Sequence, residues 1–197
     1  MSNTPKAPKI MIIRHAEKPV GKFKGVNETG DNSKHDLIVQ GWQRAGALVC
    51  LFDPARGPLQ DLLLETPKYI YASNPTSSTA STEAESDESK SNRPEETVKP
   101  LSKKLGININ LSFSKGQETE LSAAIQQCDG PVLVAWQHES IAAIGNAIPS
   151  HPSVPQDWPG DRFDMVFVFT LDIKKNTYKF DQVPQLLLAG DSSKPIS

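Results

Sequence analysis

The sequence predicts an α/β protein with a three-layer, doubly wound architecture, in which helices cover both faces of a mostly parallel sheet. Short apolar runs rich in β-branched residues alternate along the chain with stretches whose apolar residues recur at helical spacing. Three of these runs are followed directly by polar side chains. In parallel sheets, ligands bind at the carboxyl ends of the strands, where such side chains gather. The length of 197 residues favours a single domain spanning 1–197.

The first part of the chain is expected to form a strand, a helix and a second strand. Lys9–Arg14 is a short apolar run typical of a strand buried on both faces. Residues 20–36 are polar and predict a loop, and apolar residues then recur at helical spacing over 42–52 until Pro54 ends the helix. Tyr69–Ala72 is the second expected strand.

A polar segment follows the second strand. Residues 76–92 are almost entirely Ser, Thr, Glu and Asp, which bury too little apolar surface to offset the entropy lost on ordering. The segment is therefore predicted to be a flexible insertion. A helix is expected to begin at Arg93, because Pro94 suits the first helical position and the carboxylates of Glu95 and Glu96 favour the first turn.

The rest of the chain continues the alternation. Apolar residues at helical spacing over 121–128 predict another helix, and the Asp-Gly pair after it predicts a turn. The elements expected next are a buried strand at 131–136, a helix at 141–148, a long strand at 163–171 and its hairpin partner at 178–180. The hairpin indicates one antiparallel strand at the C-terminal edge of the sheet.

Charge and cysteine content exclude several classes of protein. Lys and Arg total 21 and Asp and Glu total 23, so the net charge of −2 provides no positive field for nucleic acid or anionic lipid. Cys50 and Cys128 form neither a Cys-x-x-Cys pair nor a disulfide framework, which indicates a reduced, cytoplasmic protein. The first apolar run, 10–13, is too short for a signal peptide or a membrane span. We expect no nucleic-acid partner and no membrane association.

Four further side chains carry weaker expectations. His35 and His151 lie in polar loops without the spacing of a metal site, so both are expected at the surface, and no metal or cofactor is expected. Arg44 is expected to face solvent from its helix. Trp158 lies between two prolines in a loop and either lines the mouth of the site or covers the core.

Charged side chains follow the ends of predicted strands. Arg14 and His15 follow the first strand, Arg93 lies beyond the second, and His138 and Glu139 follow a later one. The carboxyl ends of parallel strands meet at one edge of a sheet, so these side chains are expected to converge. One guanidinium group can bind two phosphate oxygens at once, and a neutral imidazole can attack phosphorus to form a covalent intermediate. The sequence therefore predicts a phosphoryl-transfer site in which His15 attacks and His138 stabilises the transferred group.

The order of these motifs along most of the chain, from Lys9 to about Phe169, resembles the histidine phosphatase superfamily, also called phosphoglycerate mutase-like. The matching motifs are Arg14-His15-Ala16, Gly41-Trp-Gln-Arg44-Ala45, Ser73, Arg93 followed by Thr97, and His138. The resemblance implies a phosphoglycerate mutase-like fold without metal or cofactor. It also implies that His15 is the phosphorylated nucleophile and that Arg14, Arg93 and His138 bind the phosphate.

Three features depart from the family pattern. Ala16 stands where the family has Gly, which implies a bulkier turn beside an intact nucleophile. The insertion at 76–92 separates Ser73 from Arg93, and Glu139 follows the second His where Gly is common.

The proton donor for the leaving group stays open between carboxylic acids. The mutase-like branch of the family carries this acid between the second Arg and the second His, which favours Glu118. The acid-phosphatase branch carries it directly after the second His, which favours Glu139. Glu17 is a third candidate. The chain lacks the large helical insert of the acid-phosphatase branch, and this slightly favours Glu118 over Glu139 as the proton donor.

The resemblance implies a metal-independent phosphohydrolase that acts on phosphomonoesters through a phosphohistidine on His15. One alternative is a phosphotransferase or mutase of the phosphoglycerate mutase type, which needs a site closed to water. Another is a phosphate-binding module without catalytic activity. The expected partner is a small phosphorylated substrate or a phosphoprotein.

Overall fold

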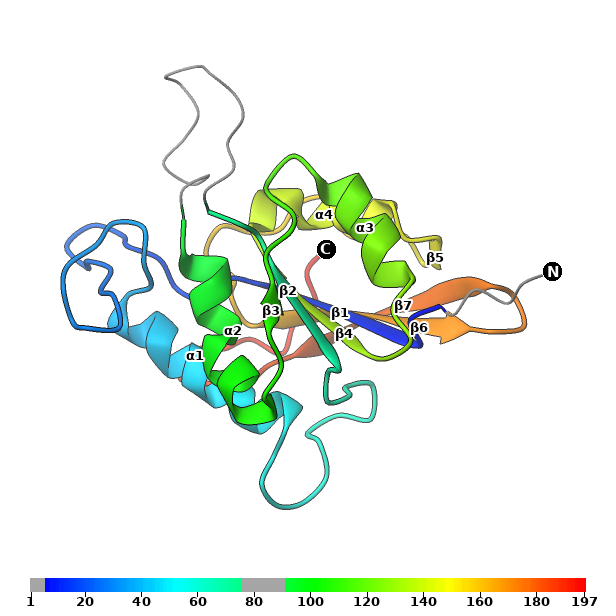
Figure 1. Cartoon of the computed structure of the whole chain (residues 1–197), viewed down its shortest axis with the longest axis horizontal. Coiled ribbons are helices and arrows are strands. Elements are labelled where there is room, and N and C mark those ends of the chain that lie inside the picture. Colours follow the sequence, from blue (N-terminus) through cyan, green and yellow to red (C-terminus); the bar gives the residue numbers. More distant parts are fainter. Residues whose placement is uncertain (1–5, 76–90) are drawn as a thin grey trace.

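A computed structural model describes residues 6–75 and 91–197, and the predicted insertion at 76–92 lies almost wholly outside them (Figure 1). The strands form one seven-stranded sheet in the order β3-β2-β4-β1-β6-β7-β5. The strands are β1 (Lys9–Arg14), β2 (Tyr69–Ala72), β3 (Ile109–Asn110), β4 (Val132–Trp136), β5 (Ser150–His151), β6 (Met165–Asp172) and β7 (Thr177–Pro184). The helices are α1 (Val39–Phe52), α2 (Arg93–Leu105), α3 (Glu118–Gln126) and α4 (His138–Asn146).

Helices cover both faces of this sheet, as the sequence predicts (Figure 1). On one face, Met11 and Ile13 of β1 pack in a core cluster with Leu48 of α1 and Val98 of α2. On the other face, alternate β1 residues join a cluster that contains α3 and α4 side chains such as Leu121 and Ile141. All six residues of β1 are buried, because both faces of this central strand are covered.

The expected antiparallel strand is present, but it lies inside the sheet rather than at its edge. β1, β2, β3 and β4 run parallel to one another. β6 runs antiparallel to both of its neighbours, β1 and β7, and the short β5 then pairs parallel to β7. Residues 165–169 are fully buried, and a run that is apolar on both faces is more stable between two strands than at a solvent-exposed edge.

The helix boundaries follow local signals in the chain. α2 begins at Arg93 with Pro94 in its first turn, as predicted, and ends at Gly106, whose φ of 66° suits glycine. α3 ends at Gln126, so Cys128 lies just beyond the helix that the sequence assigns to it. α4 begins at His138, earlier than its apolar stripe indicates, and this places a predicted site residue in the first turn of a helix.

None of the helices within 6–75 and 91–197 has the length and apolar character needed to cross a bilayer. Both cysteines are free thiols: Cys50 is exposed and Cys128 is buried.

Candidate active site

The pairing of β1 with β4 brings the two predicted site histidines to the same edge of the sheet. Arg14 lies opposite Trp136 in the parallel register, and the backbone N–H of His15 donates to the Trp136 carbonyl at 2.9 Å. Gln137 then leads directly from β4 into α4, whose first residue is His138. Segments far apart in the sequence therefore meet because their strands are neighbours.

A loop after β5 links the same two segments from the other side. Arg14 donates from Nη1 to the carbonyl of Gly160 at 2.8 Å. A side-chain carbon at Gly160 would lie 3.9 Å from Nε2 of His138. The loop therefore contacts Arg14 directly and runs beside the His138 ring, which supports the predicted convergence of these two residues.

His15 is completely buried and is held in one tautomer. Its Nδ1 lies 2.7 Å from the carbonyl oxygen of Ala16. Because a carbonyl oxygen only accepts, Nδ1 carries the proton and Nε2 carries the lone pair. Nε2 makes no hydrogen bond with any residue that the structure describes. Burial, followed by the positive charges of Arg14 and Arg93, lowers the pKa of His15 well below 6.5. A neutral ring with an available Nε2 lone pair is the nucleophilic form of histidine.

The guanidinium of Arg14 is held by backbone carbonyls of the loop before β6. Nη1 donates to Pro159 at 3.2 Å and to Gly160 and Arg162 at 2.8 Å each. The Phe163 ring lies against the group, with its centroid 3.8 Å from Cζ. These contacts fix the plane of a fully buried cation beside His15. The sequence gives no signal for the role of this loop, because its residues show neither periodicity nor a charge pattern.

Trp158 belongs to the core rather than to the site. Its indole ring is buried against Phe167, with centroids 4.7 Å apart. Its Nε1–H donates to the carbonyl of Arg162 at 2.9 Å, so the ring also steadies the loop that holds Arg14. The sequence leaves two roles open for Trp158, and the structure shows that this residue covers the core.

Arg93 opens α2 at the same site. Its side chain is buried, and Nε donates to Oγ of Ser91 at 2.6 Å. One turn later, the hydroxyl of Thr97 donates to the Arg93 carbonyl at 2.7 Å and accepts the backbone N–H of Ala16 at 2.8 Å. The first turn of α2 is thereby attached to the turn that carries His15. The predicted Arg93 and Thr97 therefore both lie beside His15.

The end of β2 is linked to the end of β4 by a hydrogen bond between two side chains. Ser73, directly after β2, is fully buried and accepts a hydrogen bond from Nε2 of Gln137 at 2.7 Å. β2 and β4 are paired, so Ser73 and Gln137 leave the sheet side by side. The Ser motif expected from the sequence is thus in place.

The two favoured carboxylates differ in their contacts. Glu118 is buried, and it accepts the N–H of Gly116 at 3.1 Å and Nε1–H of Trp136 at 3.1 Å. Glu139 instead lies 2.6 Å from Nζ of Lys115 and 2.9 Å from Nδ1 of His138. Glu118 therefore lies beside the end of β4, and Glu139 contacts a site histidine directly.

Arg44 is buried, which contradicts the expectation that it faces solvent. Its Nη2 lies 2.8 Å from Glu17 and 2.7 Å from Asp191, and Nη1 donates to Gln185 at 3.0 Å. Burial opposes the charge of Arg44, but the hydrogen bonds that it donates to Asp191 and then to Glu17 outweigh this effect and raise its pKa. The helical pattern of α1 could not reveal partners contributed by the C-terminal segment. Glu17 is thereby committed to an ion pair.

The remaining histidines carry no metal site. His151 is exposed, as expected, whereas His35 is half-buried and its carbonyl accepts the Asn92 N–H at 3.0 Å. Throughout 6–75 and 91–197, no cluster of three or more His, Cys, Asp or Glu side chains is arranged to hold a metal ion.

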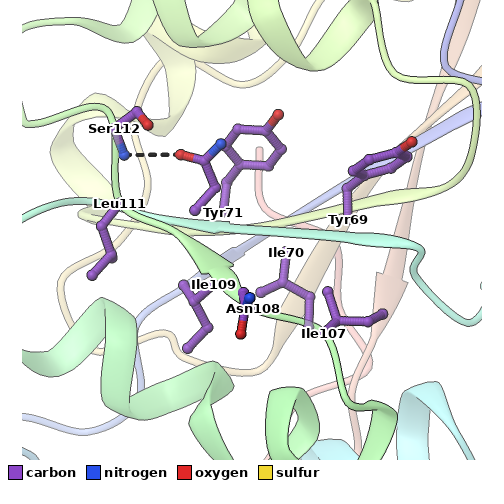
Figure 2. A pocket seen from close by; sticks show the side chains of 9 residues that line it. Tyr69, Ile70, Tyr71, Ile107, Asn108, Ile109, Leu111 and Ser112 are labelled. Atoms are coloured by element: carbon purple, nitrogen blue, oxygen red, sulfur yellow. Dashed lines mark hydrogen bonds between the residues drawn. The ribbon is translucent and has the colours of Figure 1, made fainter.

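A surface hollow of about 520 Å³ lies at a different place, on the β2–β3 edge of the sheet (Figure 2). The close view shows Tyr69 and Tyr71 on one side of β2 and Ile70 on the other. The backbone N–H of Ser112 donates to Oδ1 of Asn110 at 2.9 Å beside the hollow (Figure 2). None of the predicted site residues lines it, so it is separate from the histidine cluster.

Comparison with known proteins identifies the fold. No protein-family model matches the sequence, and a search of curated proteins finds no match. The structure of the protein histidine phosphatase SixA complexed with tungstate superposes with a TM-score of 0.53 at 13% identity, covering 90% of this chain and 97% of that one. A mycobacterial glucosyl-3-phosphoglycerate phosphatase gives 0.49 at 12% identity, covering 91% and 98%. A putative α-ribazole-5'-P phosphatase from Escherichia coli K-12 gives 0.49 at 8%, covering 90% and 96%.

Identities this low establish the fold alone, and the SixA superposition is the one that carries it. Its match extends over nearly the whole of both chains. The chain therefore has a phosphoglycerate mutase-like fold.

Proposed function

We propose that the protein is a metal-independent phosphohydrolase that acts on phosphomonoesters through a phosphohistidine on His15. One observation carries the proposal. The His15 ring is buried and neutral, with Nδ1–H fixed on the Ala16 carbonyl and the Nε2 lone pair unengaged by the described residues. Most buried polar side-chain atoms in folded proteins are hydrogen-bonded, so an unengaged nitrogen on a buried ring supports a functional role for it.

The surrounding charges suit a phosphoryl group. Arg14 and Arg93 supply two buried cations close enough to lower the pKa of His15. In the proposed reaction, they and His138 bind the non-bridging oxygens while Nε2 attacks phosphorus in line with the leaving oxygen. The bond to the leaving oxygen breaks as the N–P bond forms. The Nδ1–H of His15 remains bonded to Ala16, which stabilises the positive charge that develops on the ring.

The leaving oxygen takes a proton as it departs, and we assign that proton to Glu118. The carboxyl group is buried next to the end of β4 and lies within ion-pair distance of no cation that the structure describes. Its Oε1 accepts Nε1–H of Trp136, and both carboxylate oxygens lie 3.1 Å from the backbone N–H of Gly116, so the position of the carboxyl group is fixed. In the second step, water attacks the phosphohistidine, releases phosphate and restores the free imidazole.

The experiment that tests this proposal is the trapping of the intermediate. The wild type is mixed with a phosphorylated aryl ester and quenched in base, which preserves N-phosphorylated histidine. Phosphate on His15, detected by mass spectrometry, is expected in the wild type and absent from His15→Ala. Turnover that survives in His15→Ala would rule the mechanism out, and turnover lost on addition of a chelator would rule out metal independence.

The substrate is proposed to be a small phosphorylated molecule, with a phosphoprotein as the alternative, and the protein is proposed to act in the cytoplasm. Two free thiols in the described structure support a reducing compartment. A panel of phosphorylated metabolites and phosphopeptides, assayed for phosphate release, separates the two substrate classes.

A further inference from the structure

Three polar side chains form a continuous chain of contacts at the site. Nζ of Lys115 lies 2.6 Å from Oε1 of Glu139, and Oε2 of the same carboxylate lies 2.9 Å from Nδ1 of His138. Lys115 belongs to the loop before α3, and the other two open α4. The contact with His138 is close but lacks the alignment of a hydrogen bond. Each side chain is partly shielded, with exposed fractions of 32%, 34% and 20% in the order named.

These contacts make Glu139 an anion. Burial favours the neutral form, but the close contacts with His138 and then Lys115 outweigh it and hold the pKa of Glu139 well below its usual range. Its place in the first turn of α4, where backbone N–H groups point towards it, also favours the negative charge. A group that donates a proton to a leaving oxygen must hold that proton before the reaction. Glu139 does not meet this requirement near neutral pH.

The position of His138 shows what the anion does instead. The carboxylate oxygen lies 2.9 Å from Nδ1, and its negative charge favours the tautomer that carries the proton on that atom. The opposite nitrogen, Nε2, lies beside Gly160, whose carbonyl receives the Arg14 guanidinium. The ring therefore extends from Glu139 to the loop that holds Arg14. A carboxylate behind a histidine in this way sets both the tautomer and the direction of the ring.

We propose that Glu139, anchored by Lys115, is a positioning residue that orients His138 towards the phosphoryl group, and that it is not the proton donor. The inference rests on the proposed phosphohydrolase function. It separates the two carboxylates that the sequence leaves as alternatives: Glu118 donates the proton, and Glu139 acts through His138.

The test uses leaving groups of graded acidity. Values of kcat/KM are measured for a series of aryl phosphates with the wild type, Glu139→Gln and Glu118→Gln. For Glu139→Gln, we expect a loss of roughly tenfold that is the same for every leaving group, because the phosphate contact weakens and proton transfer does not. For Glu118→Gln, the loss should grow as the leaving group becomes more basic. A loss in Glu139→Gln that grows in the same way would overturn the proposal. Glu120→Gln, an exposed carboxylate on α3, is the matched control and should leave the rates unchanged.

A second measurement needs no turnover. The ring nitrogens of uniformly ¹⁵N-labelled histidines are observed by NMR at one fixed pH in the wild type and in Glu139→Gln, with His138→Gln to assign the signals. We expect the His138 ring signals to move in Glu139→Gln while those of His15 stay in place. Unmoved His138 signals would overturn the proposal. If the wild type hydrolyses no ester, the proposed function fails, and the NMR result still decides whether Glu139 positions His138.

Discussion

The hydroxyl of Thr97 accepts the backbone N–H of Ala16 at 2.8 Å, and this bond attaches α2 to the turn that carries His15. Both residues are fully buried, so water cannot replace either partner. The same hydroxyl donates to the carbonyl of Arg93. One side chain therefore connects the turn that carries His15 to Arg93.

Replacing Thr97 with Val is expected to cost about 1–3 kcal/mol in the free energy of unfolding, because the buried N–H of Ala16 loses its acceptor while the side-chain volume is kept. The value of kcat/KM should fall as well, since the turn carrying His15 loses its attachment. Urea denaturation and aryl phosphate assays measure the two effects. Thr97→Ser keeps the hydroxyl and should retain most of both quantities; a Ser variant as impaired as Val would show that packing, not the hydrogen bond, matters here.

His15 makes the stability of the protein depend on pH. Its pKa in the folded state is lowered well below 6.5, while the unfolded chain takes up a proton near 6.5. The contribution is complete above 6.5 and is lost as the pH falls from there towards the folded-state pKa, with a slope of up to ~1.4 kcal/mol per pH unit. His15→Asn should show a smaller loss of unfolding free energy between pH 6.5 and 5 than the wild type. Parallel curves for the two proteins would show that the ring is not held neutral.

Strand composition explains which parts of this fold are predictable from sequence. β1 and β4 are short apolar runs without alternation, and such runs indicate a central position in a covered sheet. The place of β6 is not predictable in the same way. Its apolar run is equally consistent with a parallel or an antiparallel neighbour, because burial on both faces says nothing of strand direction. The sequence therefore predicts the layers and misplaces the antiparallel strand.

The candidate site likewise contains residues that the sequence predicts and contacts that it does not. Arg14, His15 and His138 follow strand ends, so the rule that such ends converge is enough to find them. The carbonyls of 159–162 that hold Arg14 are backbone groups, which any residue type provides. Arg44 has partners from distant parts of the chain, and helical periodicity cannot identify them.

The ion pairs of Arg44 are expected to be needed for stability. The side chains of Arg44, Glu17 and Asp191 are only 3%, 10% and 6% exposed. Arg44→Met should cost about 3–5 kcal/mol in unfolding free energy, because two buried carboxylates lose their counterion. Thermal and urea unfolding measure the loss. Lys175→Met, which removes a pair with Asp172 at 3.8 Å on the surface, is the comparison and should change the stability by less than about 1 kcal/mol. Equal effects in the two variants would contradict the buried ion-pair cluster.

Glu96 gives the opposite pH dependence from His15. Burial raises its pKa to about 8, with Asp36 adding to the effect and the N–H of Leu37, which donates to Oε2 at 2.9 Å, opposing it. The unfolded chain ionises near 4.5, so the stabilising contribution is complete below 4.5 and is lost as the pH rises through about 8. Glu96→Gln keeps the hydrogen bond from Leu37 and cannot ionise. Relative to the wild type, it should gain up to about 5 kcal/mol in unfolding free energy between pH 4.5 and 8, at ~1.4 kcal/mol per pH unit. The measurement is a series of urea titrations over that range, and a constant difference between the two proteins would show that Glu96 is ionised in the folded state at neutral pH.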